Sequence, residues 1–463
     1  MAFGEMFEMQ TGLFGSSGLR GLVNVELTPV IAVKVGLAVG TLTRAGKVFV
    51  ARDTRLSGLM LENALVSGLL ACGANVYRLG VLPTPVLAYL TMRLGADAGL
   101  MITASHNPPQ YNGIKIFHSN GMAYTEKDQR GVEEIIEKGS FRLGDWRGLG
   151  KDTSLDESQL YVEMLKEKVE LKKEWRIIVD PGCGATSQIA PAVFRNFGCR
   201  VTAVNAQPDG SFPGRSPEPS PESLKPLANI VKEFGADVGV AYDGDGDRAA
   251  FLDENGNFVN FDRVLAAYAA YILEKEGGSA VVTNVEASMC VENMVEPIGG
   301  KVLRTKVGDI YVAEALKELN AVFGGEPCGA WIHPKIHLCP DGILSSVFLL
   351  KALEDKGKTL SQFVAEAPDY PVLRRNIPCK NEVKQKVVMK AGELLKSYFQ
   401  GYKNFSTVDG VRLTLENGWV LVRASGTEPL IRITVEGESL KVAEGIMEKA
   451  QGVVGLAAEE FEK

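Results

Sequence analysis

The chain has 463 residues, of which 45% are hydrophobic and 23% are charged, a composition typical of a soluble globular protein. A chain of this length exceeds what one hydrophobic core usually organises, and it predicts about three or four domains. The 50 basic and 57 acidic residues give a net charge of −7, which argues against general affinity for nucleic acid or for an anionic membrane surface.

The seven cysteines are scattered and form no CxxC pair, a pattern that favours a reducing compartment over a disulfide framework. The first twelve residues, MAFGEMFEMQTG, lack a basic region followed by a long apolar run. No later stretch stays uncharged over a membrane-spanning length. These features predict a cytoplasmic protein that binds neither membranes nor nucleic acid.

Short apolar runs alternate with stretches of helical period in the first part of the chain. Predicted strands and helices alternate in this order: 47–51, 61–73, 74–80, 85–95 and 97–103. This βαβα order predicts a largely parallel sheet covered by helices. The charged stretch 151–159 is predicted to be a linker, which places a first domain over residues 1–150.

Two further series of the same kind follow. The second has strand-like runs at 176–180, 199–204 and 236–243, and predicts a domain over 151–253. The third opens with an apolar-faced helix at 261–276 and continues with strands at 280–284 and 321–325 and a helix at 343–355. It predicts a domain over 254–368.

The last part of the chain, 369–463, changes character. Strand-like runs at 411–424 and 431–437, separated by turns, precede a helical stretch at 440–454. This order predicts a small α+β domain. The expected fold class is therefore α/β, with three related α/β domains, mixed and mainly parallel sheets, and a small C-terminal α+β domain.

An acidic cluster carries the first chemical signal. Asp243, Asp245 and Asp247 alternate with glycines in DGDGDR, and three such carboxylates can converge on one hard cation. An EF-hand loop would need glycine where Arg248 stands and helices where the flanks look like strands. Magnesium fits better in an enzyme that handles phosphate, because Mg²⁺ combines carboxylates with phosphate oxygens. The alternative is a solvated acidic turn.

The second signal is TASHNP at 103–108, which places Ser105 beside His106 in a stretch that the two following prolines keep from forming a helix. A serine hydrolase would need a G-x-S-x-G elbow, which this loop lacks. Adjacent side chains in extended chain diverge, so His106 becomes a partner of Ser105 only in a bent loop. The loop is either part of an active site or a structural turn.

Two later loops carry further polar groups. RASGTEPLIR at 423–432 offers hydroxyls, loop amides and two arginines suited to a phosphate dianion; otherwise it is a charged hairpin turn. GGEPCG at 324–329 exposes Glu326 on a tight loop, suited to sugar hydroxyls.

Two weaker patterns point to other chemistries. His333, His337 and Cys339 are of zinc-ligand type, but neighbouring prolines interrupt helical spacing. A glycine pair at 182 and 184 lacks the third glycine of a dinucleotide fingerprint, because Ser187 stands there. Neither a zinc site nor a nicotinamide enzyme is therefore favoured.

In chain order, LFGSSGLRG at 13–21 and the four loops at 103–108, 243–248, 324–329 and 423–432 resemble the α-D-phosphohexomutase superfamily of phosphoglucomutases, phosphomannomutases and phosphoglucosamine mutases. The resemblance covers nearly the whole chain. It implies four domains around one central cleft, and interconversion of hexose 6-phosphate and hexose 1-phosphate through a phosphoserine and a 1,6-bisphosphosugar.

The resemblance also assigns roles to residues. It implies a phosphorylated Ser105 and one Mg²⁺ per chain, held by the three aspartates and a phosphoserine oxygen. The residues implied near the transferred phosphoryl group are Arg20, His106, Lys115 and Arg248, and the first three of these are candidates for the acid/base. The residues implied to bind the sugar are Asp309, Glu326 and Cys328. The residues implied to bind the non-reacting phosphate are Arg423, Ser425, Gly426, Thr427 and Arg432. A hexose 1,6-bisphosphate is the expected activator, a small phosphosugar the expected partner, and a monomer or homodimer the expected assembly.

The sugar loop departs from the pattern G-E-x-S-G-H of many relatives, because Cys328 and Ala330 replace its serine and histidine. Asp309 stands where several phosphomannomutase/phosphoglucomutases have histidine and resembles the phosphoglucosamine mutase branch. Glucosamine phosphate is the favoured substrate, and a dual glucose/mannose mutase is the alternative. Hypotheses of other classes are a metal-dependent sugar phosphatase and a phosphosugar-binding sensor.

Overall fold

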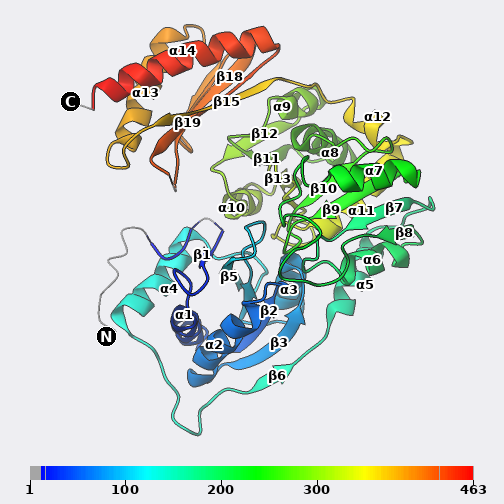
Figure 1. Cartoon of the computed structure of the whole chain (residues 1–463), viewed down its shortest axis with the longest axis vertical. Coiled ribbons are helices and arrows are strands. Elements are labelled where there is room, and N and C mark those ends of the chain that lie inside the picture. The colour runs from blue at the N-terminus through cyan, green and yellow to red at the C-terminus, as the bar shows by residue number, and fades with distance from the viewer. Residues whose placement is uncertain (1–11, 16, 427, 462–463) are drawn as a thin grey trace. The chain divides into compact units, whose positions relative to one another are not determined.

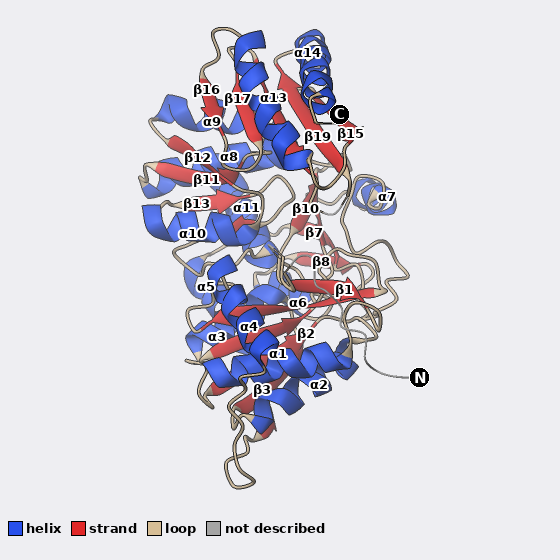
Figure 2. Cartoon of the chain, turned by 90° about the vertical axis from the view of Figure 1, so that its left-hand side faces the viewer, coloured by secondary structure: helices blue, strands red, loops and turns tan. Residues whose placement is uncertain are grey.

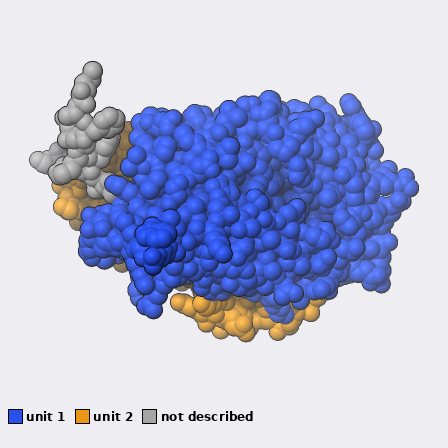
Figure 3. Space-filling view, turned by 90° about the horizontal axis from the view of Figure 1, so that it is seen from below, with its two compact units in different colours: residues 1–259, 328–363 blue, residues 260–327, 364–463 orange. Residues whose placement is uncertain are grey.

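The structure is a computed structural model that describes residues 12–15, 17–426 and 428–461. It contains two compact units, coloured separately in Figure 3. The first comprises residues 1–259 and 328–363, and the second comprises residues 260–327 and 364–463.

A mixed six-stranded sheet begins the first unit (Figure 1). In the order β1-β5-β4-β2-β3-β6, its strands are Leu19–Leu22, Tyr111–His118, Ala98–Ile102, Lys47–Arg52, Asn75–Val81 and Asp152–Ser154. Strands β4, β2, β3 and β6 are parallel, whereas β5 is antiparallel to both β1 and β4. Its helices are α1 (Pro29–Leu42), α2 (Gly58–Ala71), α3 (Thr84–Arg93) and α4 (Glu126–Lys138).

The prediction of a linker at 151–159 is wrong for residues 152–154. Residues 152–154 form β6 and pair in parallel with β3, with Asp152 opposite Val76. All three residues of β6 are exposed, so this strand has no apolar alternation by which a sequence pattern could reveal it.

The second sheet of the first unit has the order β10-β9-β7-β8. These strands are Ala249–Leu252, Val238–Tyr242, Arg176–Asp180 and Arg200–Ala203. Its helices are α5 (Ser158–Lys168), α6 (Ile189–Asn196) and α7 (Lys225–Glu233). The chain returns to this unit with β14 (Trp331–Ile332) and α11 (Gly342–Lys356), which packs against β10; α12 (Leu360–Val364) follows.

The second unit contains parallel strands β12 (Lys301–Thr305), β11 (Ala280–Asn284) and β13 (Phe323–Gly325). Its helices in this part are α8 (Phe261–Glu276), α9 (Cys290–Val295), the short η1 (Glu296–Ile298) and α10 (Asp309–Leu319). The buried strand runs and the long apolar face of α8 agree with the expected helices and strands.

An antiparallel sheet completes the second unit (Figure 2). In the order β15-β19-β18-β17-β16, its strands are Val372–Pro378, Leu430–Gly437, Gly418–Ala424, Val411–Thr414 and Asn404–Ser406. Helices α13 (Lys384–Tyr398) and α14 (Leu440–Glu459) cover one face and share its apolar core. On the other face, Trp419 and Leu421 pack against Val285.

The predicted fold class is confirmed: three sheets of mixed or parallel strands with helices, followed by an antiparallel sheet with two helices. Among the described residues, no helix is both long enough and apolar enough to cross a membrane.

Candidate active site

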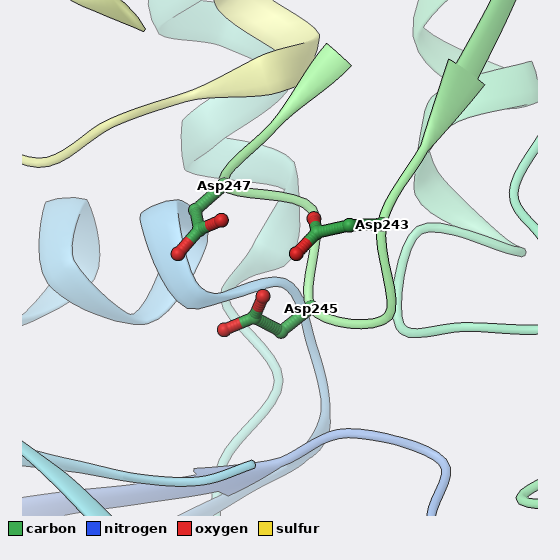
Figure 4. Close-up of side chains that lie close together, drawn as sticks. All are labelled: Asp243, Asp245 and Asp247. Carbon is green, nitrogen blue, oxygen red and sulfur yellow. The ribbon is translucent and has the colours of Figure 1, made fainter. Parts of the chain in front are cut away.

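The acidic cluster lies on the tight connection between β9 and β10, which are antiparallel neighbours with Tyr242 opposite Ala249. The side chains of Asp243, Asp245 and Asp247 point toward one another from this loop (Figure 4). One carboxylate oxygen from each lies within 4.8 Å of the others. Asp243 and Asp245 are fully buried, so the cluster is not a solvated acidic turn.

Glycine allows this loop to approach the serine loop. A Cβ atom added at Gly244 would overlap with the carbonyl oxygen of Ser105. Gly184, from the glycine pair that superficially suggested a dinucleotide site, packs against the carbonyl of Gly244 in the same manner. Both glycines therefore serve close backbone packing around the acidic loop.

Ser105 lies between β4 and β5 and is 1% exposed. Its backbone is in the left-handed region, with φ +49°, which bends the loop. The Ser105 hydroxyl donates to Asp243 Oδ2 at 2.6 Å, and its Oγ lies 3.3 Å from His106 Nδ1. The bend brings Ser105 and His106 to the same acidic cluster.

A buried guanidinium holds the serine loop in this shape. Arg55, 1% exposed, donates to the backbone carbonyls of Ser105 at 2.8 Å, Asn107 at 2.6 Å, Pro108 at 2.6 Å and Tyr111 at 2.9 Å. These bonds satisfy carbonyls that a bent, buried loop leaves without strand partners.

Asp53 completes this support. Its Oδ2 accepts a 3.0 Å bond from Arg55 Nε and a 2.7 Å bond from the Thr103 hydroxyl. Thr103 Oγ1 in turn accepts the amide of Ser105 at 2.8 Å. Burial raises the pKa of Asp53, while Arg55 opposes that rise. The position of the serine therefore depends on a side-chain network that begins at the end of β2.

Lys115, from β5, joins two of the aspartates. Its Nζ donates to Asp245 Oδ2 at 2.8 Å and to Asp247 Oδ2 at 2.7 Å. Thr84, at the start of α3, donates its hydroxyl to Asp245 Oδ2 at 2.5 Å. Asp243 Oδ1 accepts the amides of Gly246 at 2.9 Å and Arg248 at 3.2 Å.

The pKa values of Asp243 and Asp245 shift in opposite directions. Burial raises the pKa of Asp243 well above its usual range, and the neighbouring aspartates add to this effect. Burial also opposes ionisation of Asp245, but Lys115 and the Thr84 hydroxyl more than offset it and lower the pKa of that carboxyl. The raised pKa favours the neutral form of Asp243, whereas Lys115 keeps Asp245 ionised.

Two carboxylate oxygens test whether the cluster fits a metal ion. Asp245 Oδ1 and Asp247 Oδ1 are buried and accept no hydrogen bond from any residue that the structure describes. Arg248 Nε lies 3.9 Å from Asp247 Oδ1, beyond hydrogen-bonding distance. Oxygen ligands from three carboxylates suit a hard divalent cation. The cluster could thus hold a metal ion.

Cations surround His106. Burial, Arg248 and Arg20 lower the pKa of His106 to about 2, so its imidazole is neutral at physiological pH. Arg20, from β1, donates to the Asn107 side chain at 2.7 Å. The structure therefore brings together Ser105, the three aspartates and all four of the predicted residues Arg20, His106, Lys115 and Arg248.

The predicted sugar residues of the second unit also lie near one another. Glu326, 7% exposed, accepts the Asn284 amide at 2.6 Å and the backbone amide of Gly308 at 2.8 Å. Asp309 follows Gly308 and begins α10. Cys328 is half-buried and belongs to the first unit.

The loop between β18 and β19 holds most of the predicted phosphate residues. Ser425 is buried and its Oγ accepts the amide of Glu428 at 3.2 Å. Arg432 is half exposed and donates to Glu428 Oε2 at 2.9 Å. Gly426 is exposed, and Thr427 lies outside the described residues.

Arg423 has a different environment from Arg432. Its guanidinium forms an ion pair with Glu286 and another, at 2.9 Å, with Asp409. Asp409 also accepts the amide of Val307 at 3.1 Å. Arg423 thus connects the phosphate loop to the 307–309 turn.

The weaker zinc pattern forms no metal cluster. His337 is hydrogen-bonded through Nε2 to Asp341 at 3.0 Å and through Nδ1 to the amide of Cys339 at 3.3 Å. The aspartate triad is the one group of potential metal ligands found among the described residues.

Sequence reasoning missed the residues that support the loops. Arg55, Asp53 and Thr84 contact groups that are distant in sequence, and Lys384 donates to the carbonyl of Ser425 at 2.5 Å. The one local signal for Asp53 and Arg55 was that an acid and an arginine, two residues apart, directly follow an apolar strand.

Four families describe this chain: "Phosphoglucomutase/phosphomannomutase", alpha/beta/alpha domains I, II and III and the C-terminal domain. They match residues 11–143, 159–256, 260–370 and 376–451. A probable phosphoglucosamine mutase from Methanothermobacter thermautotrophicus is 45% identical over 451 residues, covering 96% of this chain and 98% of the relative. A second, from Methanopyrus kandleri, is 45% identical over 450 residues, covering 96% and 98%.

Among solved structures, a phosphoglucomutase/phosphomannomutase family protein from Burkholderia thailandensis is similar, with a TM-score of 0.86 and 28% identity. The match covers 96% of this chain and 97% of that chain. The arrangement of serine, acidic cluster and loops thus occurs in a chain whose residues 11–451, apart from short gaps, match the four domain models of phosphoglucomutase/phosphomannomutase. The chain belongs to the α-D-phosphohexomutase superfamily and is an intramolecular phosphotransferase that isomerises hexose phosphates.

Proposed function

We propose that the chain is a phosphoglucosamine mutase that uses Ser105 as its phosphoryl carrier. One observation carries the role of Ser105: its buried hydroxyl lies 2.6 Å from Asp243 Oδ2, beside three carboxylates with converging oxygens. The Ser105 hydroxyl in this position does not contribute to the stability of the hydrophobic core. Its phosphoester would lie directly against the metal-binding carboxylates.

In the proposed reaction, the Oγ–P bond of phosphorylated Ser105 breaks as a sugar hydroxyl oxygen forms a bond to phosphorus. The resulting 1,6-bisphosphosugar turns over and returns its other phosphate to Ser105, which restores the enzyme. Phosphorylation removes the proton that Ser105 donates to Asp243 Oδ2 and frees this oxygen for a cation. A bound Mg²⁺ would supply charge stabilisation for the phosphoryl group in transfer.

Arg248 and Lys115 bring positive charge to the same region. Lys115 holds Asp245 and Asp247 in place, and Arg248 lies beside Asp247. Preset charges of this kind stabilise a transferring phosphoryl group without reorganisation during the reaction. We assign both residues to this electrostatic role.

The sugar hydroxyl must lose a proton as it attacks. Among the three candidates, we favour His106 for its position, because its Nδ1 lies 3.3 Å from Ser105 Oγ. Burial, Arg248 and Arg20 lower its pKa to about 2, so this role requires the negative charge of the bound phosphates to offset these cations and make the imidazole more basic. Lys115 is bound to two carboxylates, and Arg20 keeps its proton at any physiological pH.

We assign recognition of the sugar to Glu326, Asp309 and Cys328. Asp309 offers a carboxylate for the C2 ammonium of glucosamine, which glucose and mannose lack. The names of the 45% identical relatives support glucosamine as the substrate. The non-reacting phosphate would bind Arg423, Ser425, Gly426, Thr427 and Arg432, with Arg432 the arginine not bridged between two carboxylates.

We also propose the following domains, activator, assembly and location for the chain. The phosphoserine loop falls in a domain over 1–150 extended by β6, the metal loop in 151–253, the sugar loop in 254–368 and the phosphate loop in 369–463. A hexose 1,6-bisphosphate would prime the enzyme. We expect a monomer or homodimer in the cytoplasm that binds one Mg²⁺ and a small phosphosugar, but neither nucleic acid nor a membrane.

Product analysis tests the function. With bisphosphate priming, we expect glucosamine 1- and 6-phosphates to interconvert with little release of inorganic phosphate. Dominant release of phosphate would identify a phosphatase instead. Saturable binding of the phosphosugar without turnover would identify a sensor.

The sugar assignment is tested by kcat/KM for glucosamine, glucose and mannose 1-phosphates, each primed with its own bisphosphate. We expect wild type to prefer glucosamine and Asp309→Asn to lose part of that preference. Equal or better use of glucose or mannose by the wild type would establish the dual mutase, to which the altered Cys328 and Ala330 also point.

A further inference from the structure

A cavity of about 500 Å³ in the second unit is lined by residues of α9 and β12 and of β16 and β17. Figure 2 shows where these four elements lie. Its walls include Asn404, Ser406, Arg412 and Thr414. Neither the serine and acidic loops nor the sugar and phosphate loops line it. The cavity is therefore separate from every group assigned to the mutase reaction.

Strand register directs these four side chains to one face. Arg412 is paired with Ser406, and Thr414 is paired with Asn404. Paired residues and alternate residues of antiparallel strands share a face of the sheet. Trp419, paired with Thr414, is on the same face, which is opposite to the helix-covered core.

Arg412 is the unusual member of this group. The residue is only 6% exposed, and its Cζ lies 4.5 Å from the centre of the Trp419 ring. Over the described ranges 12–15, 17–426 and 428–461, its guanidinium makes neither a hydrogen bond nor an ion pair, and its Nε is fully buried. A buried cation without a hydrogen-bonded partner is unfavourable.

The neighbouring charged groups are bound elsewhere. Arg304 donates to both oxygens of Glu292, at 2.8 and 2.7 Å, and to three backbone carbonyls. Glu436 Oε2 accepts Trp419 Nε1 at 2.6 Å and the amide of Met289 at 2.8 Å. Burial and the positive charge of Arg304 lower the pKa of Arg412 well below its usual value.

We propose that this cavity binds a small oxyanion, a carboxylate or a phosphate group, through the guanidinium of Arg412. The Trp419 ring covers one face of the guanidinium and leaves its N–H edge for a bidentate contact with two oxygens. Asn404, Ser406 and Thr414 supply further polar groups to the ligand.

Charge and size define the ligand class. A single water would accept one N–H and leave the positive charge uncompensated, whereas the cavity has room for a larger molecule. Glu296 and Glu416 also line the cavity, and Glu416 is paired with Lys403 at 2.9 Å, so the positive charge is concentrated at Arg412 and favours a small anion over a long polyanion. An occupant would connect α9 and β12 to β16 and β17, although β12 ends at Thr305 and β16 begins only at Asn404.

The test uses the full chain with Arg432→Ala, so that the phosphate loop does not contribute to binding. Inorganic phosphate and acetate are titrated separately by calorimetry in a chloride buffer. We expect saturable binding of one or both, weakened at least about tenfold by Arg412→Gln and also weakened by Arg412→Lys, which lacks the fork. Binding of phosphate alone identifies a phosphate ester, binding of acetate alone a carboxylate, and binding of both a general oxyanion site.

No saturable binding of either anion, or binding unchanged by Arg412→Gln, would overturn the proposal. A stability comparison guards against a folding defect. In oxyanion-free buffer, Arg412→Met should not lower the Tm, because the charge that it removes has no partner, whereas Arg304→Met should lower the Tm by breaking a paired guanidinium. An equal drop in both variants would mean that Arg412 is already satisfied within the protein, which also contradicts the site.

Discussion

The loops around Ser105 and the loop from Arg423 to Arg432 both serve a phosphate in the proposed function, but they are built differently. Ser105 is 1% exposed and the side chain of Asp245 is fully buried, whereas the side chains of Arg432 and Glu428 are 51% and 54% exposed. Partners on several loops, on β5 and at the start of α3 hold the buried groups in place. The exposed arginine has one carboxylate partner from its own loop.

This difference separates two tasks. Buried, fixed charges can match a transition state without reorganisation, and their loss lowers kcat. An exposed arginine is screened by water and salt, and it contributes mainly to ground-state binding. We therefore expect substitutions in the buried region to act on kcat and substitutions in the exposed loop to act on KM.

The largest effect is expected for Ser105→Ala. Loss of the proposed carrier should reduce kcat by about 1000-fold or more while the Tm changes little. Turnover after bisphosphate priming and thermal unfolding measure both. Ser67→Ala, an exposed helix hydroxyl, is the matched control. A Ser105→Ala enzyme with wild-type turnover would remove the serine from the mechanism.

The second largest effect is expected when one of the proposed metal ligands is replaced. Asp245→Asn loses charge at the cluster and is expected to weaken Mg²⁺ binding and to reduce kcat by about 100-fold or more. Calorimetric titration of Mg²⁺ gives a readout independent of activity. Asp237→Asn, an ion-paired aspartate just before β9, should retain Mg²⁺ affinity. Unchanged Mg²⁺ affinity in Asp245→Asn would place the metal elsewhere.

A smaller effect on kcat is expected for Arg55→Lys, which keeps the charge but cannot reach four carbonyls and Asp53 together. We expect kcat to fall about tenfold or more and KM to change less than about threefold, because the serine loop loses its position. Arg52→Lys, at the end of β2, is the control. A larger change in KM than in kcat would show that Arg55 does not act by positioning the serine.

A substitution in the exposed phosphate loop should change KM and leave kcat nearly constant. Arg432→Ala removes a charge-assisted contact to phosphate of about 1.5–3 kcal/mol, which corresponds to a rise in KM of about 10- to 150-fold. The wild-type KM should also rise with ionic strength, and the variant should lose part of that dependence. If kcat falls instead while KM is constant, the division between buried and exposed regions is wrong.

Local pattern was sufficient for most elements of this fold. Helix α8 and strands β7 and β11 have strong apolar signals, and they occupy the predicted residues. Strand β6 was missed because its three residues are exposed and its pairing with β3 depends on main-chain geometry. Helix α13 was also not identified in advance.

The site was predictable where chemistry is concentrated in a short motif, as in Asp243 to Asp247. It was not predictable where a side chain acts on distant backbone. Arg55 contacts carbonyls 50 and 52 residues away, and Thr84 contacts Asp245 from the start of α3, 161 residues earlier in the chain. The partners of Arg423 were also not evident from the loop that contains it.

The central claim, that Ser105 carries the phosphoryl group, is tested most directly by mass spectrometry of the intact protein and of its peptides. The enzyme is incubated with glucosamine 1,6-bisphosphate and then with excess glucosamine 1-phosphate. We predict one phosphoryl group per chain, located on Ser105. If this group is isotopically labelled, the label should pass to the added sugar phosphate within about one turnover while Ser105 stays phosphorylated. A fully active enzyme that carries no phosphate, or carries it on another residue, would contradict the account.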